Sequence, residues 1–438
     1  MKKMLETLLH TRLYLRALTK WVALAVLVGL CCGGVGSLFH LGVEWATEYR
    51  LSHPVLIWCL PLAGLVIVGF YKLTKTEGQG TDDIIDAVHM GKSLSVLLIP
   101  AIFTGTILTH LCGGSAGREG AALQMGGDIG YHVGELFHMD DRDMRTATLC
   151  GMSAFFSALF GTPLTATVFS MMVVSVGVLY HAAFIPCFTA ALVAYGISIW
   201  AGVSPTRFTV AAPGLEPWTL LRVVALGALC AVAAVLFCNA IRHTAGFFRR
   251  RIENPFLRAA CGGFLIVGLT LLAGTSDYNG VGMDVIRRAV EEGSAVPAAF
   301  ALKLIFTAVT LGTGYKGGEV VPSFFVGATF GCVAGPLLGL PAGFSAAVGL
   351  VAVFCACVNC PVASMFLSVE LFGSEGLLYF ALACGISYML SGYNGLYSSQ
   401  TILYSKLKAQ YINVHTNAYH AGEQPDDHSD LRAKAGRE

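Results

Sequence analysis

Two glutamates lie within glycine-rich interruptions of the chain's apolar segments. Glu119 belongs to the phrase Gly-Ser-Ala-Gly-Arg-Glu-Gly at 114–120, and Glu319 to the phrase Gly-Gly-Glu-Val-Val-Pro at 317–322. A glycine-rich turn before a helix leaves backbone N–H groups free, and the helix dipole adds positive potential at that end. A carboxyl group in apolar surroundings favours its neutral form and can exchange a proton. These phrases therefore predict anion binding by backbone amides, with protonatable acids beside the anion.

Each acid also has a purely structural interpretation. Glu119 follows Arg118 and Glu319 lies close to Lys316, so each could form an ion pair with that base or cap a helix. An ionisable side chain within a membrane is costly and is by default a hypothesis about function. We therefore predict a functional role for both acids, and leave the ion pair and the helix cap as alternatives.

The chain repeats one of its own phrases. Residues 78–88 read Gly-Gln-Gly-Thr-Asp-Asp-Ile and end in Ala-Val, and residues 280–290 read Gly-Val-Gly-Met-Asp-Val-Ile and end in Ala-Val. The same spacing relates Gly113 to Gly314, Gly117 to Gly318 and Gly126 to Gly327. So long a period excludes a short solenoid repeat and indicates a duplicated half. Glycine-interrupted apolar segments at matching places of two halves predict a binding site where broken helices meet.

Composition places the chain in a membrane. Its 438 residues are 55% hydrophobic and 13% charged, and the mean hydropathy is +0.67. Soluble domains carry about 25% charged residues. Apolar runs such as 17–43 and 219–241 are long enough to span a bilayer. We predict an all-α polytopic membrane protein with broken, tilted helices. A net charge of +1 indicates no nucleic-acid partner, and no cofactor or metal motif is present.

The predicted organisation follows the duplication. Residues 1–21 are expected to form a cytoplasmic N-terminal segment, 22–200 the first membrane repeat, 201–222 a linker with the start of the next helix, and 223–404 the second repeat. The polar residues 405–438 predict a disordered cytoplasmic tail, too short for a regulatory CBS domain. Because the first apolar run is long and lacks a cleavage site, we interpret it as a retained helix of a plasma-membrane protein.

The two halves are predicted to have opposite orientations. Residues 41–53 carry two glutamates and one arginine, whereas the equivalent residues 242–254 carry four arginines and one glutamate. Lys and Arg favour the cytoplasmic side of a membrane. These equivalent turns are therefore expected on opposite faces, as in transporters built from inverted repeats.

The phrases at 114–120 and 317–322, together with Tyr397 near the last apolar segment, resemble the CLC chloride channel and transporter family. The resemblance runs from about residue 20 to 405. It implies the CLC fold, transport of chloride or fluoride, no cofactor, and a homodimer with one pathway in each subunit. Exchange of an anion for protons, gated by Glu119, is the function it favours; a passive chloride channel is the alternative.

The resemblance also implies roles for individual residues. Glu119 matches the gating glutamate, which competes with anions and carries protons, and backbone amides around it would line an outer anion site. The amides of Glu319 and Val320, with the Tyr397 hydroxyl, would form a central site. The residues implied in anion binding are Gln79, Gly117, Arg118, Gly120, Gly318, Val320 and Tyr397, and those implied in gating or proton transfer are Glu119 and Glu319.

Several departures from the usual family pattern bear on the ion. Gln79 replaces an anion-coordinating serine, and Glu319 replaces an apolar residue. Both changes resemble the fluoride-exporting branch, which usually has threonine where this chain has Ala121. Between Met144 and Leu215 there is no Asp or Glu, so the inner proton-transfer glutamate of the chloride antiporters has no counterpart. The choice between chloride and fluoride stays open, and Glu319 is a candidate second proton carrier.

Two other classes of function compete with transport. Residues 113–117 form a G-x-S-x-G phrase, which with His110 would suggest an intramembrane serine hydrolase using Ser115. That arrangement needs a strand before the serine, and the apolar helical context predicts none. A membrane scaffold without transport is the other alternative, but it leaves two acids within the membrane unexplained.

Overall fold

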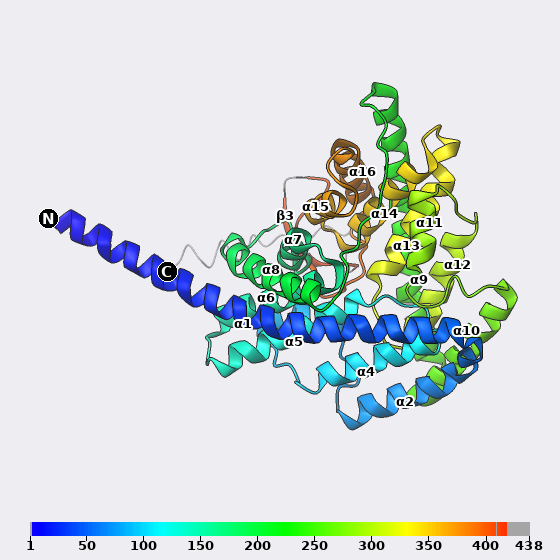
Figure 1. The fold of residues 1–438 in the computed structure, drawn as a ribbon, viewed down its shortest axis with the longest axis horizontal. Coiled ribbons are helices and arrows are strands. Elements are labelled where there is room, and N and C mark those ends of the chain that lie inside the picture. Colours follow the sequence, from blue (N-terminus) through cyan, green and yellow to red (C-terminus); the bar gives the residue numbers. More distant parts are fainter. Residues whose placement is uncertain (1, 409, 418–438) are drawn as a thin grey trace, which may run out of the picture.

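The computed structural model describes residues 2–408 and 410–417, with the backbone alone for residues 2–10. The described chain is almost entirely helical, as Figure 1 shows. The helices of the first half are α1 (Lys2–Ser52), α2 (Leu60–Leu73), α3 (Thr81–Met90), α4 (Leu98–Leu111), α5 (Glu119–Leu136), α6 (Asp141–Phe160), α7 (Pro163–Val173) and α8 (Phe184–Trp200). Those of the second half are α9 (Pro217–Arg251), α10 (Pro255–Ala273), α11 (Met283–Glu291), α12 (Ala299–Gly312), α13 (Val320–Leu337), α14 (Ala342–Val358), α15 (Pro361–Phe372) and α16 (Leu377–Leu390).

The two series of helices correspond in order, and two of the corresponding pairs are equal in length. The short helix α3 has its counterpart in α11, and both begin directly after the repeated glycine phrase. α4 and α12 have 14 residues each, and α5 and α13 have 18 each. The order of elements therefore agrees with the duplication seen in the sequence.

Helix lengths divide the fold into spanning and partial elements. The described segments long and apolar enough to cross a membrane are Thr11–Ser52, Pro54–Leu73, His181–Trp200, Pro217–Arg251, Pro255–Ala273 and Val320–Leu337. Other apolar helices, such as α4 and α12, have fewer residues than a bilayer requires. The prediction of a multi-pass helical protein with broken helices is confirmed.

Close helix packing forms the core beside the broken helices. α5 and α6 approach each other at Gly126 and Gly151, where a Cβ on either residue would overlap the carbonyl oxygen of the other. In the second half, α13 and α14 meet in the same way at Gly327 and Gly349. Small residues let helix backbones approach within lipid, where no hydrophobic force drives association. These two pairs hold the helices whose N-termini begin at the candidate site.

The N-terminal helix covers the first predicted segment and the start of the first predicted repeat. α1 runs unbroken from Lys2 to Ser52, so it crosses the expected boundary between 1–21 and 22–200. Residues 1–21 hold six leucines, three lysines and two arginines, which are good helix formers, and no proline interrupts them. Its first part projects beyond the helical body, as Figure 1 shows.

The C-terminal residues form a small sheet with a segment of the first half. Its strands are β1 (Ser175–Val176), β2 (Thr401–Tyr404) and β3 (Tyr411–His415). β1 pairs in parallel with β2, and β2 pairs antiparallel with β3. This sheet connects the segment that follows Tyr397 to the end of α7.

The prediction of disorder from residue 405 onward is wrong for β3. Ile412 is buried with Val176 and Ile402, and Lys406 Nζ donates a 2.6 Å hydrogen bond to Asn359 Oδ1. Burial of alternate side chains and this partly buried hydrogen bond stabilise the segment despite its polar composition. Residues 409 and 418–438 lie outside the described residues, so the prediction for them is untested.

Candidate functional site

The two glycine-rich loops that precede α5 and α13 pair with each other. The Gly117 N–H donates to the Gly318 carbonyl at 2.7 Å, and the Gly318 N–H donates back to the Gly117 carbonyl at 2.7 Å. This antiparallel bridge joins equivalent residues of the two halves. It brings the N-terminal ends of α5 and α13 together, where the first N–H groups of each helix have no intrahelical partner.

The bridge changes the roles expected of its two glycines. Both N–H groups are taken by the opposite loop, so Gly117 and Gly318 join the halves rather than donating to an anion. Gly120 and Val320, in contrast, lie in the first turns of α5 and α13, where backbone N–H groups are available to a ligand.

Gly318 is needed for this close approach. A Cβ at this position would overlap the Gly120 backbone nitrogen and come near its Cα. Because both neighbours are backbone atoms, a side-chain rotation cannot relieve the clash.

We therefore expect Gly318→Ala to separate the loops and to lower stability by about 1–3 kcal/mol, the usual cost of overpacking. Thermal unfolding of purified protein in detergent measures this change. The matched control is Gly268→Ala in α10, where an added Cβ meets no atom within 4 Å. An unfolding temperature equal to that of the wild type for Gly318→Ala would contradict the packing argument.

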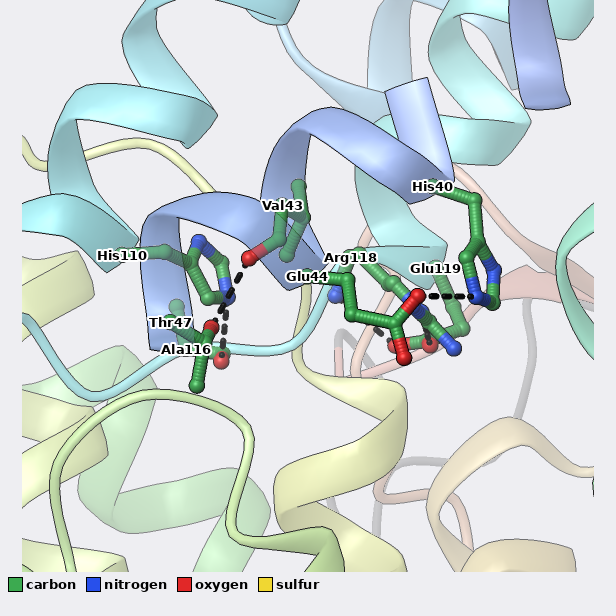
Figure 2. Close-up of polar contacts among 8 residues, drawn as sticks. All are labelled: His40, Val43, Glu44, Thr47, His110, Ala116, Arg118 and Glu119. Carbon is green, nitrogen blue, oxygen red and sulfur yellow. Dashed lines mark hydrogen bonds and ion pairs between the residues drawn. The ribbon is translucent and has the colours of Figure 1, made fainter. Parts of the chain in front are cut away.

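The Glu119 side chain folds back onto the start of its own helix. Its carboxyl is 1% exposed, and Oε2 accepts a 2.9 Å hydrogen bond from the Arg118 backbone N–H. Oε1 lies 3.4 Å from Arg118 Nε, the ion pair drawn in Figure 2. The carboxylate thus occupies a helix N-terminus that is suited to an anion. The predicted alternative, an ion pair with Arg118, is also present.

Two histidines lie near this pair. His110 contacts the Thr106 carbonyl at 2.8 Å and the Ala116 carbonyl at 3.1 Å, which fixes the loop before Arg118. His40 of α1 lies 3.6 Å from Glu44, and Arg118 is within electrostatic range of it. Figure 2 shows His40 and Glu44 on the segment of α1 that passes Glu119. Sequence reasoning did not identify His40, because one polar residue within an apolar helix gives no indication of its neighbours.

The hydrolase interpretation of Ser115 is wrong. Its Oγ lies 3.1 Å from Thr307 Oγ1, and its N–H donates to Thr310 Oγ1. Both ring nitrogens of His110 face backbone carbonyls, so His110 does not serve as a base for this serine. The preceding element is the helix α4, whereas a nucleophile elbow requires a strand.

Glu319 is the residue directly before α13, and it forms neither of its predicted structural contacts. No side-chain hydrogen bond caps the helix, and among the described residues Glu319 Oε2 is buried without a partner. Lys316 Nζ lies instead over the Tyr71 ring, 4.1 Å from its centroid. A Cβ on Gly120 would lie 3.0 Å from Glu319 Oε2, so this acid faces the loop that carries Glu119.

A cavity of about 280 Å³ lies beside Glu319. Gln79, Lys316 and Tyr397 line it together with Glu319. The Tyr397 hydroxyl and Gln79 Oε1 are buried, and neither has a hydrogen-bond partner among the described residues. Buried polar groups are rarely left unpaired, and a cluster of them at a cavity is typical of a binding site.

The helix beside Gln79 begins directly after the glycine phrase. α3 starts at Thr81, and its N-cap is Gly80. Asp83 Oδ2 accepts a 2.9 Å hydrogen bond from the Gly80 N–H. Asp82 accepts instead from the Ser399 N–H at 3.0 Å, which ties α3 to the loop that carries Tyr397.

A buried polar network holds the loop after Tyr397. Gln400 Nε2 donates to the carbonyls of Val173 and Val358 at 2.9 Å each, and its Oε1 accepts from Asn359 Nδ2 at 3.1 Å. Sequence reasoning missed Gln400 and Asn359. The available signal was an amide residue at each end of an apolar stretch, which is too common to single them out.

Comparison with known proteins supplies a family. A protein-family model described as voltage gated chloride channel matches residues 62–392 of this chain. A chloride/fluoride channel protein of Pseudomonas syringae pv. tomato is 37% identical over 398 residues, covering 89% of this chain and 88% of that protein. The H(+)/Cl(-) exchange transporter ClcA of Vibrio vulnificus is 25% identical over 436 residues, covering 90% of this chain and 92% of the transporter.

Solved structures agree with this result. The crystal structure of a CLC-type fluoride/proton antiporter is similar with a TM-score of 0.85 and 30% sequence identity, covering 88% of this chain and 98% of that chain. A slow cyanobacterial Cl-/H+ antiporter is similar with a TM-score of 0.72 and 21% identity, covering 85% of this chain and 94% of that one.

Proposed function

The chain belongs to the voltage-gated chloride channel family of membrane halide transporters, and from this premise we propose that it exchanges fluoride for protons. The observation that carries the proposal is the pair of acids, Glu119 and Glu319, at the bridged loops. Glu319 and Gln79 are departures shared with fluoride exporters in the resemblance drawn from the sequence. The similarity to a fluoride/proton antiporter and to a chloride/fluoride channel protein supports the same ion.

The proposed anion route passes through the cavity beside Glu319. Arg249 lines this cavity and belongs to the arginine cluster at the end of α9. The positive-inside rule therefore favours an opening to the cytoplasm. An anion would pass Glu319 and the Tyr397 hydroxyl and reach the first-turn amides of α5.

Glu119 would control the last part of this route. While ionised, its carboxylate occupies the N-terminal end of α5 and excludes an anion by like charge. When Glu119 takes up a proton, its attraction to these amides weakens, and an anion can bind in its place. Return of the ionised side chain displaces the anion, so one residue couples the two movements.

The remaining assignments belong to the same proposal. Both termini would lie in the cytoplasm, with 22–200 and 223–404 as inverted repeats in the plasma membrane. The protein would act as a homodimer with a separate pathway in each subunit, as the family resemblance implies. The exposed apolar side chains of α8 and α16 are compatible with lipid or with a second copy.

Efflux from proteoliposomes tests the function. We expect fluoride to leave liposomes faster than chloride, and an inward proton gradient to accelerate fluoride export. Ion-selective electrodes measure both anions, and a pH dye follows proton entry in the same preparation. Anion flux without any proton movement would instead support the passive channel.

A further inference from the structure

The Lys316 ammonium lies at a cavity wall without a carboxylate partner. Its Nζ is 4.1 Å from the centroid of the Tyr71 ring, and no ion pair with an acid is formed within the described residues. The stem of the side chain packs beside Gly105. A cation over an aromatic face is held by the ring quadrupole, but its charge is not neutralised.

Among the described residues, none of the acids that share a cavity with Lys316, which are Asp82, Asp83, Glu319, Glu77 and Glu253, forms an ion pair with it. Asp83 pairs with Lys92 and accepts from the Gly80 N–H. Asp82 accepts from the Ser399 N–H. Glu319 is within electrostatic range of Lys316, yet its Oε2 has no hydrogen-bond partner among the residues that the structure describes. The positive charge of Lys316 is therefore available to a mobile anion.

Lys316 also lies where two cavities adjoin. The cavity beside Glu319, of about 280 Å³, shares lining residues with a neighbouring cavity of about 400 Å³. The shared lining residues are Tyr71, Gly78, Arg249, Leu311, Tyr315 and Lys316. Gln79 and Tyr397 line only the cavity beside Glu319, and Arg258 lines only the other. Lys316 therefore lies on the wall that the two cavities have in common.

We propose that Lys316, whose ammonium lies over the Tyr71 ring, attracts the anion from the second cavity toward Glu319. The ring has a second effect, because it keeps the ammonium from forming a lasting ion pair with Glu319. Glu319 then remains free to exchange a proton, and Lys316 remains free to attract the anion. The direction of movement rests on the proposed function; the attraction of an anion to Lys316 does not.

Substitution of Lys316 tests the attraction. We expect Lys316→Met to raise the fluoride concentration that gives half-maximal efflux about tenfold, equivalent to about 1.4 kcal/mol. The maximal rate should change much less, because Lys316 is a positioning residue that acts on the approaching anion. Lys316→Arg keeps the charge and should restore most of the lost affinity.

The matched control is Lys72→Met. Lys72 Nζ also lies over an aromatic ring, 5.4 Å from the centroid of Phe256, but this lysine is exposed and lines neither cavity. Its half-saturating concentration should equal that of the wild type. An unchanged value in Lys316→Met, or an equal change in Lys72→Met, would overturn the proposal.

The contact between the Lys316 ammonium and the Tyr71 ring is tested separately. Tyr71→Phe keeps the ring and removes a buried hydroxyl that has no hydrogen-bond partner in the described part of the chain, so transport should be retained. Tyr71→Leu removes the ring and lets Lys316 approach Glu319, so the number of protons moved per anion should fall. Equal coupling in the Leu and Phe variants would show that the ring does not separate these charges.

A measurement of fluoride binding tests the role of Lys316 independently of the proposed exchange of fluoride for protons. Isothermal titration calorimetry of the purified protein with fluoride gives an affinity that needs no transport. Weaker binding in Lys316→Met, with the binding of Lys72→Met unchanged, supports the role of Lys316 even if the wild type proves to be a passive channel. Equal binding in all three proteins overturns it, whatever the transport assays give.

Discussion

Replacement of Glu119 by glutamine is expected to abolish proton movement while some anion flux remains. Glutamine has nearly the shape of the protonated acid but cannot take up or release a proton at neutral pH. Without the negative charge, the side chain no longer competes with an anion for the amides at the start of α5. Proton entry should therefore fall to the rate of protein-free liposomes, and fluoride efflux should no longer respond to a pH gradient.

The control for this variant lies on the same helix. Glu135 is near the other end of α5, where its side chain is exposed and 2.9 Å from His132. Glu135→Gln changes the same functional group at a distance from the bridged loops, so coupling should remain. Proton movement equal to the wild type in Glu119→Gln would remove this acid from the coupling mechanism.

The parts of the site that occur in both halves of the chain could be predicted from the sequence. Glycine phrases at matching positions indicated where broken helices begin, and α3, α5, α11 and α13 start at those phrases. The acids at 119 and 319 were identifiable because a carboxyl group within an apolar segment is rare. What the spacing could not show was contact. Equivalence of Gly117 and Gly318 does not by itself imply that they bond to each other.

The hydrogen-bond network of Gln400, which holds the loop after Tyr397, could not be predicted from the sequence. Gln400 bonds to residues near the ends of α7 and α14, and these partners are far apart along the chain. An isolated amide residue has no periodicity, so its partners emerge only when the fold is complete. The same holds for β3, whose burial depends on Val176 of the first half.

The two acids have different charge environments. Glu119 accepts a backbone hydrogen bond and lies beside Arg118, so its ionised form has partners at the start of α5. Within the described part of the chain, Glu319 has neither a cap bond nor an ion pair, and Lys316 lies over the Tyr71 ring. We infer that Glu119 alternates with the anion, whereas Glu319 acts on protons or on the choice of anion beside the cavity.

Replacement of Glu319 by glutamine is accordingly expected to lower the number of protons moved per anion or to reduce the preference for fluoride over chloride. Glutamine keeps the size of the side chain but cannot carry a proton. When Glu319 carries the proton, its carboxyl group can donate a hydrogen bond to fluoride. When fluoride carries the proton, hydrogen fluoride can donate a hydrogen bond to the Glu319 carboxylate. Chloride accepts such bonds less strongly. The measurement is paired fluoride and chloride efflux with simultaneous proton uptake.

The control is Glu292→Gln, at the exposed end of α11 and outside the cavity lining. It should leave both the coupling and the preference unchanged. The two structural roles considered for Glu319, a helix cap and an ion pair with Lys316, are both missing from the described residues. Loss of the charge should therefore leave the unfolding temperature nearly unchanged while it alters transport. A variant that unfolds earlier yet couples normally would reverse this inference and make Glu319 a structural residue.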